Sequence, residues 1–246
     1  MNKLLIISRS TLLASPPVWL ENGSCHHPLL QSDAEYLLNN EVSWHEVLKS
    51  FILFVVSSLI IITNLVFMFS LNVVTSTKML PVSTLLLLVS LALCQLLTGL
   101  CVTTWGVYPA LTECWPFGRH LCQIQAVMGG ALRQQNSLCL VLIAVERYVS
   151  QTNQDLHLSL FSKPLTILYI LATWLSSLGL YSVIVFSLEG FYLSTSALSV
   201  CEPHYRSVQM LVLTSCVFYF PTTMLLMYCY GTIYHSQKLK MKNRSA

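Results

Sequence analysis

Two residues of opposite charge, Glu146 and Arg147, follow the apolar run LCLVLIAV at residues 138–145. A carboxylate at a partly desolvated site holds a neighbouring arginine more firmly than water does. Breaking such a pair would be a plausible switch. The alternative is an interfacial pair whose side chains reach water at the end of a membrane helix.

Arg133 is a second charged residue that lies within an otherwise apolar region. A guanidinium binds carboxylates and phosphates through a bidentate fork, so it suits an anionic ligand. Helical spacing places Gln125, Gly129, Arg133, Asn136 and Arg147 near one face. We expect Gly129 and Gly130 to leave room for a ligand above Arg133. The candidates for a ligand pocket are Gln125, Gly129, Gly130 and Arg133. In the alternative interpretation the protein itself neutralises Arg133, for example through Glu113 or Glu189.

The elements that position these residues are expected to be membrane helices. Only 9% of the 246 residues are charged and 54% are apolar, whereas about 25% of residues are charged in a soluble domain. Five stretches approach the roughly 20 residues that a helix needs to span a bilayer, and in lipid only helices satisfy their own backbone. They are residues 51–71, 82–107, 121–146, 165–188 and 208–234. The predicted fold is an all-α transmembrane helix bundle.

Charge sets the expected orientation. If the helices alternate with the N-terminus outside, basic residues gather on the cytoplasmic side, which is the usual distribution. This predicts an extracellular tail over residues 1–46, a membrane domain over 47–234 and a basic cytoplasmic tail over 235–246. The sequon at Asn22 would then carry a glycan.

Several motifs recur at spacings that belong together. The turn WPFG at residues 115–118 is followed four residues later by Cys122, and the triplet Glu146-Arg147-Tyr148 ends the same helix. Over residues 51–234 the chain resembles the rhodopsin-like, class A family of G-protein-coupled receptors. Six residues stand at landmark positions of that family: Asn64, Gln95, Trp115, Asn136, Trp174 and Pro221.

The resemblance implies a plasma-membrane receptor without enzymatic activity, cofactor, metal or nucleic-acid partner. Its expected partners are an extracellular ligand, a heterotrimeric G protein, the lipid bilayer and a second receptor chain. Glu146 would restrain Arg147 at rest, and Arg147 would turn toward the G protein on activation. Topology leaves four cysteines outside, Cys25, Cys114, Cys122 and Cys201. The resemblance implies the disulfide between the last two.

Departures from the family pattern carry their own predictions. Gln95 replaces an aspartate, so we expect a hydrogen bond from Gln95 to Asn136 instead of a sodium site. Gly129 stands where receptors for biogenic amines have an aspartate, which argues against an amine ligand.

The chain offers five predicted helices where the family has seven. We therefore expect that the 246-residue chain, as a fragment, a splice form or a five-helix product, does not activate a G protein alone. It would instead partner a full-length receptor and retain it inside the cell, in the endoplasmic reticulum. A membrane transporter is the remaining alternative.

Overall fold

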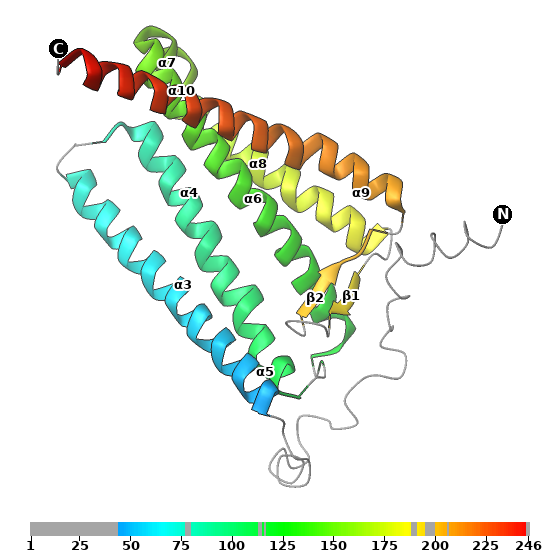
Figure 1. Cartoon of the computed structure of the whole chain (residues 1–246). Coiled ribbons are helices and arrows are strands. Elements are labelled where there is room, and N and C mark those ends of the chain that lie inside the picture. The colour runs from blue at the N-terminus through cyan, green and yellow to red at the C-terminus, as the bar shows by residue number, and fades with distance from the viewer. Residues whose placement is uncertain are drawn as a thin grey trace.

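Five long helical segments run side by side in the computed structural model (Figure 1). The structure describes residues 44–76, 80–112, 115, 117–187, 191–194, 200–205 and 207–244. The segments are α3 (Trp44–Ser76); α4 (Val82–Thr98), which continues through the π-helical η1 (Gly99–Thr103) into α5 (Thr104–Thr112); α6 (Gly118–Thr152); α8 (Lys163–Ser182) with η2 (Val183–Ser187); and α9 (Val208–Thr214), η3 (Ser215–Tyr219) and α10 (Phe220–Arg244).

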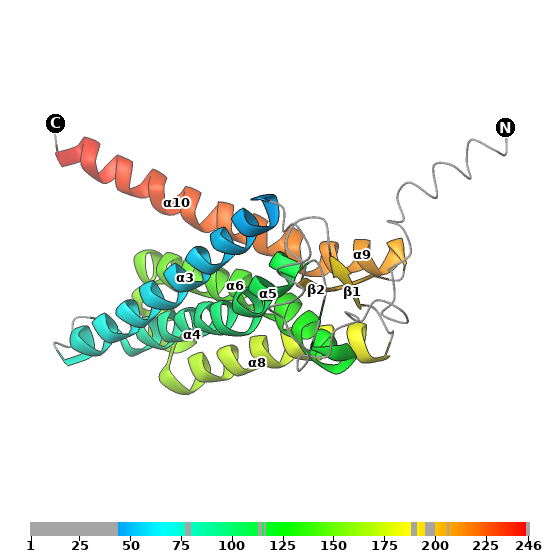
Figure 2. The same ribbon diagram turned by 90° about the horizontal axis from the view of Figure 1, so that it is seen from below.

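Helix α6 lies at the centre of the bundle. It packs against α4, α8, α10 and the hairpin that follows α8. Figure 2 shows the bundle from below, with the hairpin toward one end and the C-terminal part of α10 extending beyond the other. Because α6 touches elements at both ends, it connects the two regions that the sequence singled out.

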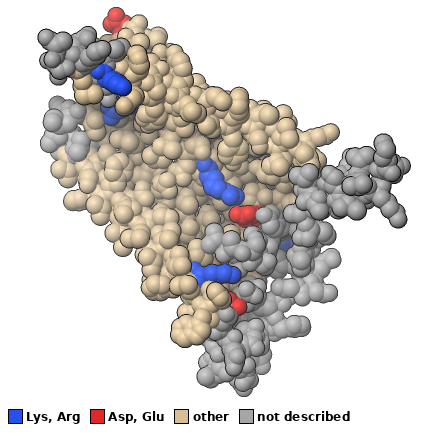
Figure 3. All heavy atoms as spheres, in the orientation of Figure 1, with Lys and Arg blue, Asp and Glu red and all other residues tan. Residues whose placement is uncertain are grey.

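Four helical stretches are long and apolar enough to cross a membrane: Trp44–Val73, Val82–Leu111, Lys163–Ser187 and Val208–Ser236. Large apolar side chains stay exposed on all four, and uncharged residues cover most of the surface in Figure 3. The helix predicted at 121–146 does not meet the same criterion, since glutamines interrupt its apolar sequence. Those glutamines are buried by neighbouring helices, because a polar group facing lipid is costly: Gln123, Gln125, Gln134 and Gln135.

Three exposed hydroxyl groups in α3 are satisfied by the helix itself. Ser58, Thr63 and Ser70 each donate to the carbonyl four residues earlier, at 2.8, 2.6 and 2.8 Å. In lipid no water would replace these acceptors, so back-bonding lets hydroxyl residues face outward.

A wide π turn precedes Pro221 in the last segment. A proline inside a helix removes one backbone hydrogen bond, and its ring crowds the carbonyl four residues earlier. That carbonyl belongs to Val217, which lies within η3. The π turn lets the helix accommodate the proline.

Three described elements, one helix and two strands, were not predicted from the sequence. Helix α7 (Gln154–Leu160) lies in the loop after α6, and strands β1 (Phe191–Ser194) and β2 (Val200–Pro203) form an antiparallel hairpin. Residues 235–246 were predicted as a tail, yet α10 continues through them to Arg244. The helices otherwise begin and end within six residues of the predicted ranges, apart from α3, which begins seven residues early, at Trp44.

Candidate functional site

The hairpin is tied to the N-terminal part of α6 by a disulfide. Cys122 in α6 and Cys201 in β2 are bonded, with Cα atoms 5.3 Å apart and 79 positions between them in the sequence. This confirms the predicted pairing. Cys25 and Cys114, the other two extracellular candidates, lie outside the described residues.

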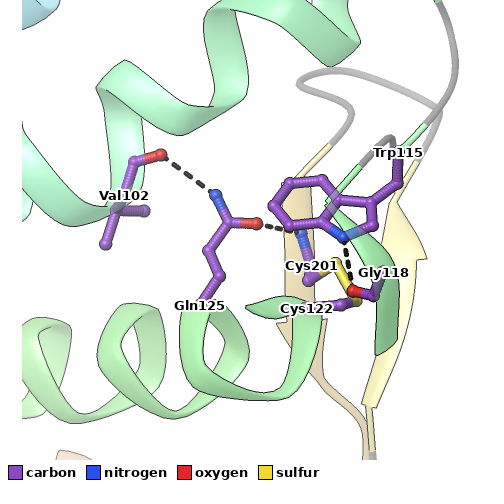
Figure 4. Close-up of a disulfide and its surroundings, with 6 residues drawn as sticks. All are labelled: Val102, Trp115, Gly118, Cys122, Gln125 and Cys201. Carbon is purple, nitrogen blue, oxygen red and sulfur yellow. Dashed lines mark hydrogen bonds between the residues drawn. A yellow bond between two sulfur atoms is a disulfide. The ribbon is translucent and has the colours of Figure 1, made fainter. Parts of the chain in front are cut away.

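Gln125 of α6 also forms a hydrogen bond to the hairpin (Figure 4). Its Oε1 accepts a hydrogen bond from the Cys201 amide at 2.9 Å, and its Nε2 donates to the Val102 carbonyl at 3.2 Å. The side chain is fully buried. Both polar atoms are therefore occupied by backbone groups, and Gln125 links the hairpin to η1.

Trp115 is buried in the same cluster as the Cys122–Cys201 disulfide. Its indole Nε1 donates to the Gly118 carbonyl at 2.9 Å, and its ring meets Phe117 edge-on with centroids 5.1 Å apart. Gly118 has a φ of 77°, a left-handed conformation that favours glycine. Phe117 and Gly118 thus form a turn that begins α6, and Trp115 packs in the same buried cluster as the disulfide.

The glycines before Arg133 serve helix packing. A Cβ placed on Gly130 would overlap the ring of Tyr181 from α8, and one placed on Gly129 would lie 3.8 Å from Val102. The expectation that both glycines leave room above Arg133 is therefore not met at Gly130, since Tyr181 occupies that space.

Arg133 pairs with an acid that the sequence did not single out. Its Nη1 lies 3.6 Å from Oε1 of Glu202 in β2, and its Nε donates to the Gly129 carbonyl at 3.1 Å. The arginine side chain is 57% exposed. Glu113 and Glu189, the acids proposed from the sequence, lie outside the described residues.

A cavity of about 630 Å³ opens beside this ion pair. Its walls come from α6, α8, η3, α9, strand β2 and the segment that follows it. They include both charged residues, tyrosines and apolar side chains: Arg133, Ser137, Tyr181, Glu202, Pro203, His204, Tyr205, Val208, Leu211, Ser215 and Tyr219. Of the four predicted pocket residues, only Arg133 lines this cavity; Gln125, Gly129 and Gly130 do not.

Three tyrosine hydroxyls meet in the wall of the cavity. The Tyr181 hydroxyl lies 3.3 Å from that of Tyr205 and 3.1 Å from that of Tyr219. Burial raises the pKa of Tyr205, so its hydroxyl stays neutral at physiological pH. The group is a polar surface that can both donate and accept hydrogen bonds.

Polar contacts at the middle of the bundle differ from the predicted ones. Trp174 donates from its indole to the Ser90 hydroxyl at 3.1 Å, which joins α8 to α4. Asn64 donates to the Ile60 carbonyl of its own helix at 2.8 Å. The buried side-chain oxygen of Asn136 has no hydrogen-bond partner within the described residues. The predicted bond from Gln95 to Asn136 is therefore wrong.

Glu146 is buried near the C-terminal end of α6 in a cluster with two other elements. Its Oε1 accepts from the Thr84 hydroxyl at 2.7 Å and lies 3.0 Å from Nε2 of His157 in α7. Arg147 is farther away, with its Nε 3.7 Å from Oε2 of Glu146. The Glu146 side chain is 1% exposed and that of Arg147 is 44% exposed. The carboxylate is therefore held mainly by Thr84 and His157.

Tyr148 contacts the last helix. Its hydroxyl lies 3.5 Å from that of Tyr228 in α10, and the two rings meet edge-on with centroids 5.7 Å apart. The three residues of the triplet thus lie in different surroundings. Glu146 lies in the buried cluster, Arg147 is half exposed and Tyr148 contacts α10.

Comparison with known proteins decides the family. Residues 64–246 match the model of the seven-transmembrane receptors of the rhodopsin family. The chain belongs to this family. This match confirms the resemblance noted in the sequence. The rhodopsin family consists of receptors and is generally non-enzymatic.

Individual relatives of the rhodopsin family differ in the ligands that their names give. Trace amine-associated receptor 6 of Pan troglodytes is 25% identical over 220 residues, which cover 87% of this chain and 59% of that protein. Type-1 angiotensin II receptor A of Rattus norvegicus is 29% identical over 124 residues, 49% of this chain and 33% of the relative. Trace amine-associated receptor 5 of Mus musculus is 30% identical over 115 residues, which cover 47% of this chain and 34% of that protein.

The chain thus spans about three fifths of the length of the first of these relatives and about one third of the other two. Because two of the three are named for trace amines, the comparisons do not support the exclusion of amine ligands that Gly129 suggested.

The sequence analysis did not identify the partners of Arg133 and Glu146 in this rhodopsin-family chain. Glu202 directly follows Cys201, so the disulfide that pins the hairpin also brings this acid over α6. That adjacency was a usable signal. His157 lies eleven residues beyond Glu146 and returns to it only because α7 folds back. No local pattern announces that contact.

Proposed function

We propose that this receptor senses an extracellular ligand in the cavity beside Arg133 and passes the signal to a heterotrimeric G protein near Arg147. The supporting observation is that one helix, α6, carries both residues. At 1.5 Å per residue they are about 21 Å apart along the axis. A shift of α6 against its neighbours would therefore reach both ends.

The distribution of contacts along α6 supports this direction of signalling. Near the middle of α6, Arg133 faces the cavity and contacts the disulfide-bound hairpin. At the inner end, Arg147 is half exposed while Glu146 is buried and bonded. An exposed arginine is available to a protein partner, whereas a buried carboxylate fixes the helix that carries it.

The proposal includes the orientation of the chain. The predicted charge distribution supports an extracellular N-terminus at the plasma membrane, with the hairpin outside and α7 inside. The lipid bilayer then surrounds the four apolar spans, and Asn22 is available for glycosylation.

Nucleotide exchange on a panel of heterotrimeric G proteins tests the function. Membranes that contain the 246-residue chain are compared with membranes that contain the Arg147→Ala variant at equal amounts. A signalling receptor gives exchange that this substitution lowers at least tenfold, equivalent to about 1.4 kcal/mol. Equal exchange with both chains for every G protein would contradict signalling by this chain.

A second candidate function is a non-signalling partner of a longer receptor. The described part of the chain contains five long helical segments, whereas the name of the family gives seven. This candidate predicts no exchange in the same assay. It also predicts less of a longer receptor at the cell surface when the chain is co-expressed, and retention of both in the endoplasmic reticulum.

A further inference from the structure

The cavity beside Arg133 has an apolar side as well as a charged one. Val208 and Leu211 of α9 form part of its wall, opposite in character to Arg133 and Glu202. A volume of about 630 Å³ lies within the roughly 300–1,000 Å³ typical of small-molecule sites. The site therefore fits a compact molecule with one apolar part and one polar part.

The hydrogen-bonding capacity of Arg133 is only partly used. Its Nε donates to a carbonyl of its own helix at 3.1 Å. Its Nη1 lies 3.6 Å from Glu202, well beyond the 2.7–2.9 Å typical of a charge-assisted hydrogen bond. Among the described residues, neither terminal nitrogen makes a hydrogen bond, and those two nitrogens form the fork that binds a carboxylate.

The position of Arg133 makes an added anion favourable. It lies eleven residues beyond Cys122, about 16 Å along the helix, where an uncompensated charge costs roughly 2.5–3.5 kcal/mol. Glu202 compensates it at a long distance. A carboxylate in bidentate contact would compensate it at a short one.

We propose that the ligand is a small organic carboxylate whose acid group binds the terminal nitrogens of Arg133 and whose apolar part packs against Val208 and Leu211. This rests on the proposed ligand-sensing function and names the chemistry of the ligand. The tyrosine hydroxyls of Tyr181, Tyr205 and Tyr219 border the cavity and can accept or donate further hydrogen bonds. Glu202 moves away from the guanidinium when the carboxylate binds.

Three probes that share one aromatic body test the charge preference: 3-phenylpropionate, phenylalanine and phenethylamine. They carry an acid, an acid with an ammonium group, and an ammonium group alone. Binding to the 246-residue chain in lipid nanodiscs is measured by the shift in unfolding temperature, up to about 10 mM of probe. Both carboxylates should bind at least tenfold more tightly than phenethylamine.

Three variants separate the role of Arg133 from its structural effect. Arg133→Gln should abolish carboxylate binding, and Arg133→Lys, which keeps the charge but loses the fork, should weaken it about tenfold. Glu202→Gln should retain or strengthen it, because the competing carboxylate is gone. An intact Cys122–Cys201 disulfide and monodisperse behaviour show that each variant has folded; if Arg133→Gln fails this check, Arg133→Lys decides.

Three results would overturn the proposal. Tighter binding of phenethylamine, carboxylate binding unchanged in the Arg133 variants, or no binding of either carboxylate would each contradict it. The measurement contains no G protein. Exchange that depends on Arg147, together with absent carboxylate binding, would leave the receptor function in place and remove the ligand class. Carboxylate binding without exchange would do the reverse.

Discussion

At the scale of single residues, distances rank the partners of Glu146. The Thr84 hydroxyl and the His157 ring lie 2.7 and 3.0 Å from one carboxylate oxygen, whereas the Arg147 contact is 3.7 Å and half exposed. A buried hydrogen bond to an ionic group contributes about 1.5–3 kcal/mol. An exposed ion pair contributes about 0–1 kcal/mol.

We therefore expect His157→Phe to destabilise the protein more than Arg147→Met does. Phenylalanine keeps the ring that stacks on Phe161, with centroids 5.7 Å apart in the native structure, and removes only the bond to Glu146. The expected losses in the free energy of unfolding are about 1–3 and below about 1 kcal/mol. Unfolding in mixed micelles measures both, and the reverse order would contradict this ranking.

Two glutamines on α6 give a matched pair of substitutions. Gln125 makes hydrogen bonds through both polar atoms, while both polar atoms of buried Gln134 have no partner among the described residues. Gln125→Met leaves a buried amide unpaired and should cost about 1–3 kcal/mol, but Gln134→Met should be neutral or stabilising. Thermal unfolding of the two variants decides; equal destabilisation would show that the Gln125 bonds add nothing.

The sequence predicted contacts between residues close together in the chain better than contacts between distant residues. The sequence placed Glu146 and Arg147 at the end of an apolar helix but did not predict that Glu146 is buried. The bonds of Gln125 reach Val102 and Cys201, which lie 23 and 76 positions away. Helical spacing showed which face Gln125 shares but not what opposes that face.

At the scale of elements, α6 and α8 approach closely where a glycine permits it. A methyl group on Gly130 would overlap the Tyr181 ring, whereas one on Gly179 in α8 would meet nothing within 4 Å. The contact depends on the missing side chain, and it also fixes Tyr181 in the cavity wall.

Gly130→Ala should therefore force the two helices apart, with a loss of about 1–3 kcal/mol, typical of overpacking. Gly179→Ala should change stability little or raise it, because alanine favours helix. The midpoint of thermal unfolding compares the two. If both variants melt together with the native protein, the packing at Gly130 is looser than described.

The helices were predictable and their junctions were not. Apolar runs of about 20 residues identify membrane helices by composition alone. The hairpin β1–β2 and the helix α7 are short, and their stability comes from the disulfide, from Gln125 and from His157. These contacts involve residues far apart in the sequence, so no local pattern predicts them.

At the scale of the whole molecule, orientation is the property that fixes which end of α6 meets which partner. Sequons stand at both ends of the chain, at Asn22 and Asn243. Only an acceptor in the lumen of the secretory pathway receives a glycan. With an extracellular N-terminus, Asn22 should be glycosylated and Asn243 should not.

Glycosidase treatment should then shift the mass of the native chain and of Asn243→Gln, but not that of Asn22→Gln. A shift that disappears in Asn243→Gln would place the cavity at the inner face and contradict the proposed sensing of an extracellular ligand.

The polarity of α6 bears on how the chain is made. Four spans are apolar enough to cross a membrane unaided, while α6 has its glutamines covered by neighbours. During synthesis α6 leaves the ribosome before α8, so part of its cover does not yet exist. We therefore expect stable insertion of α6 into the membrane to depend on the later arrival of α8. Substitutions that loosen α6 from α8 should therefore reveal themselves first as chains degraded during biogenesis.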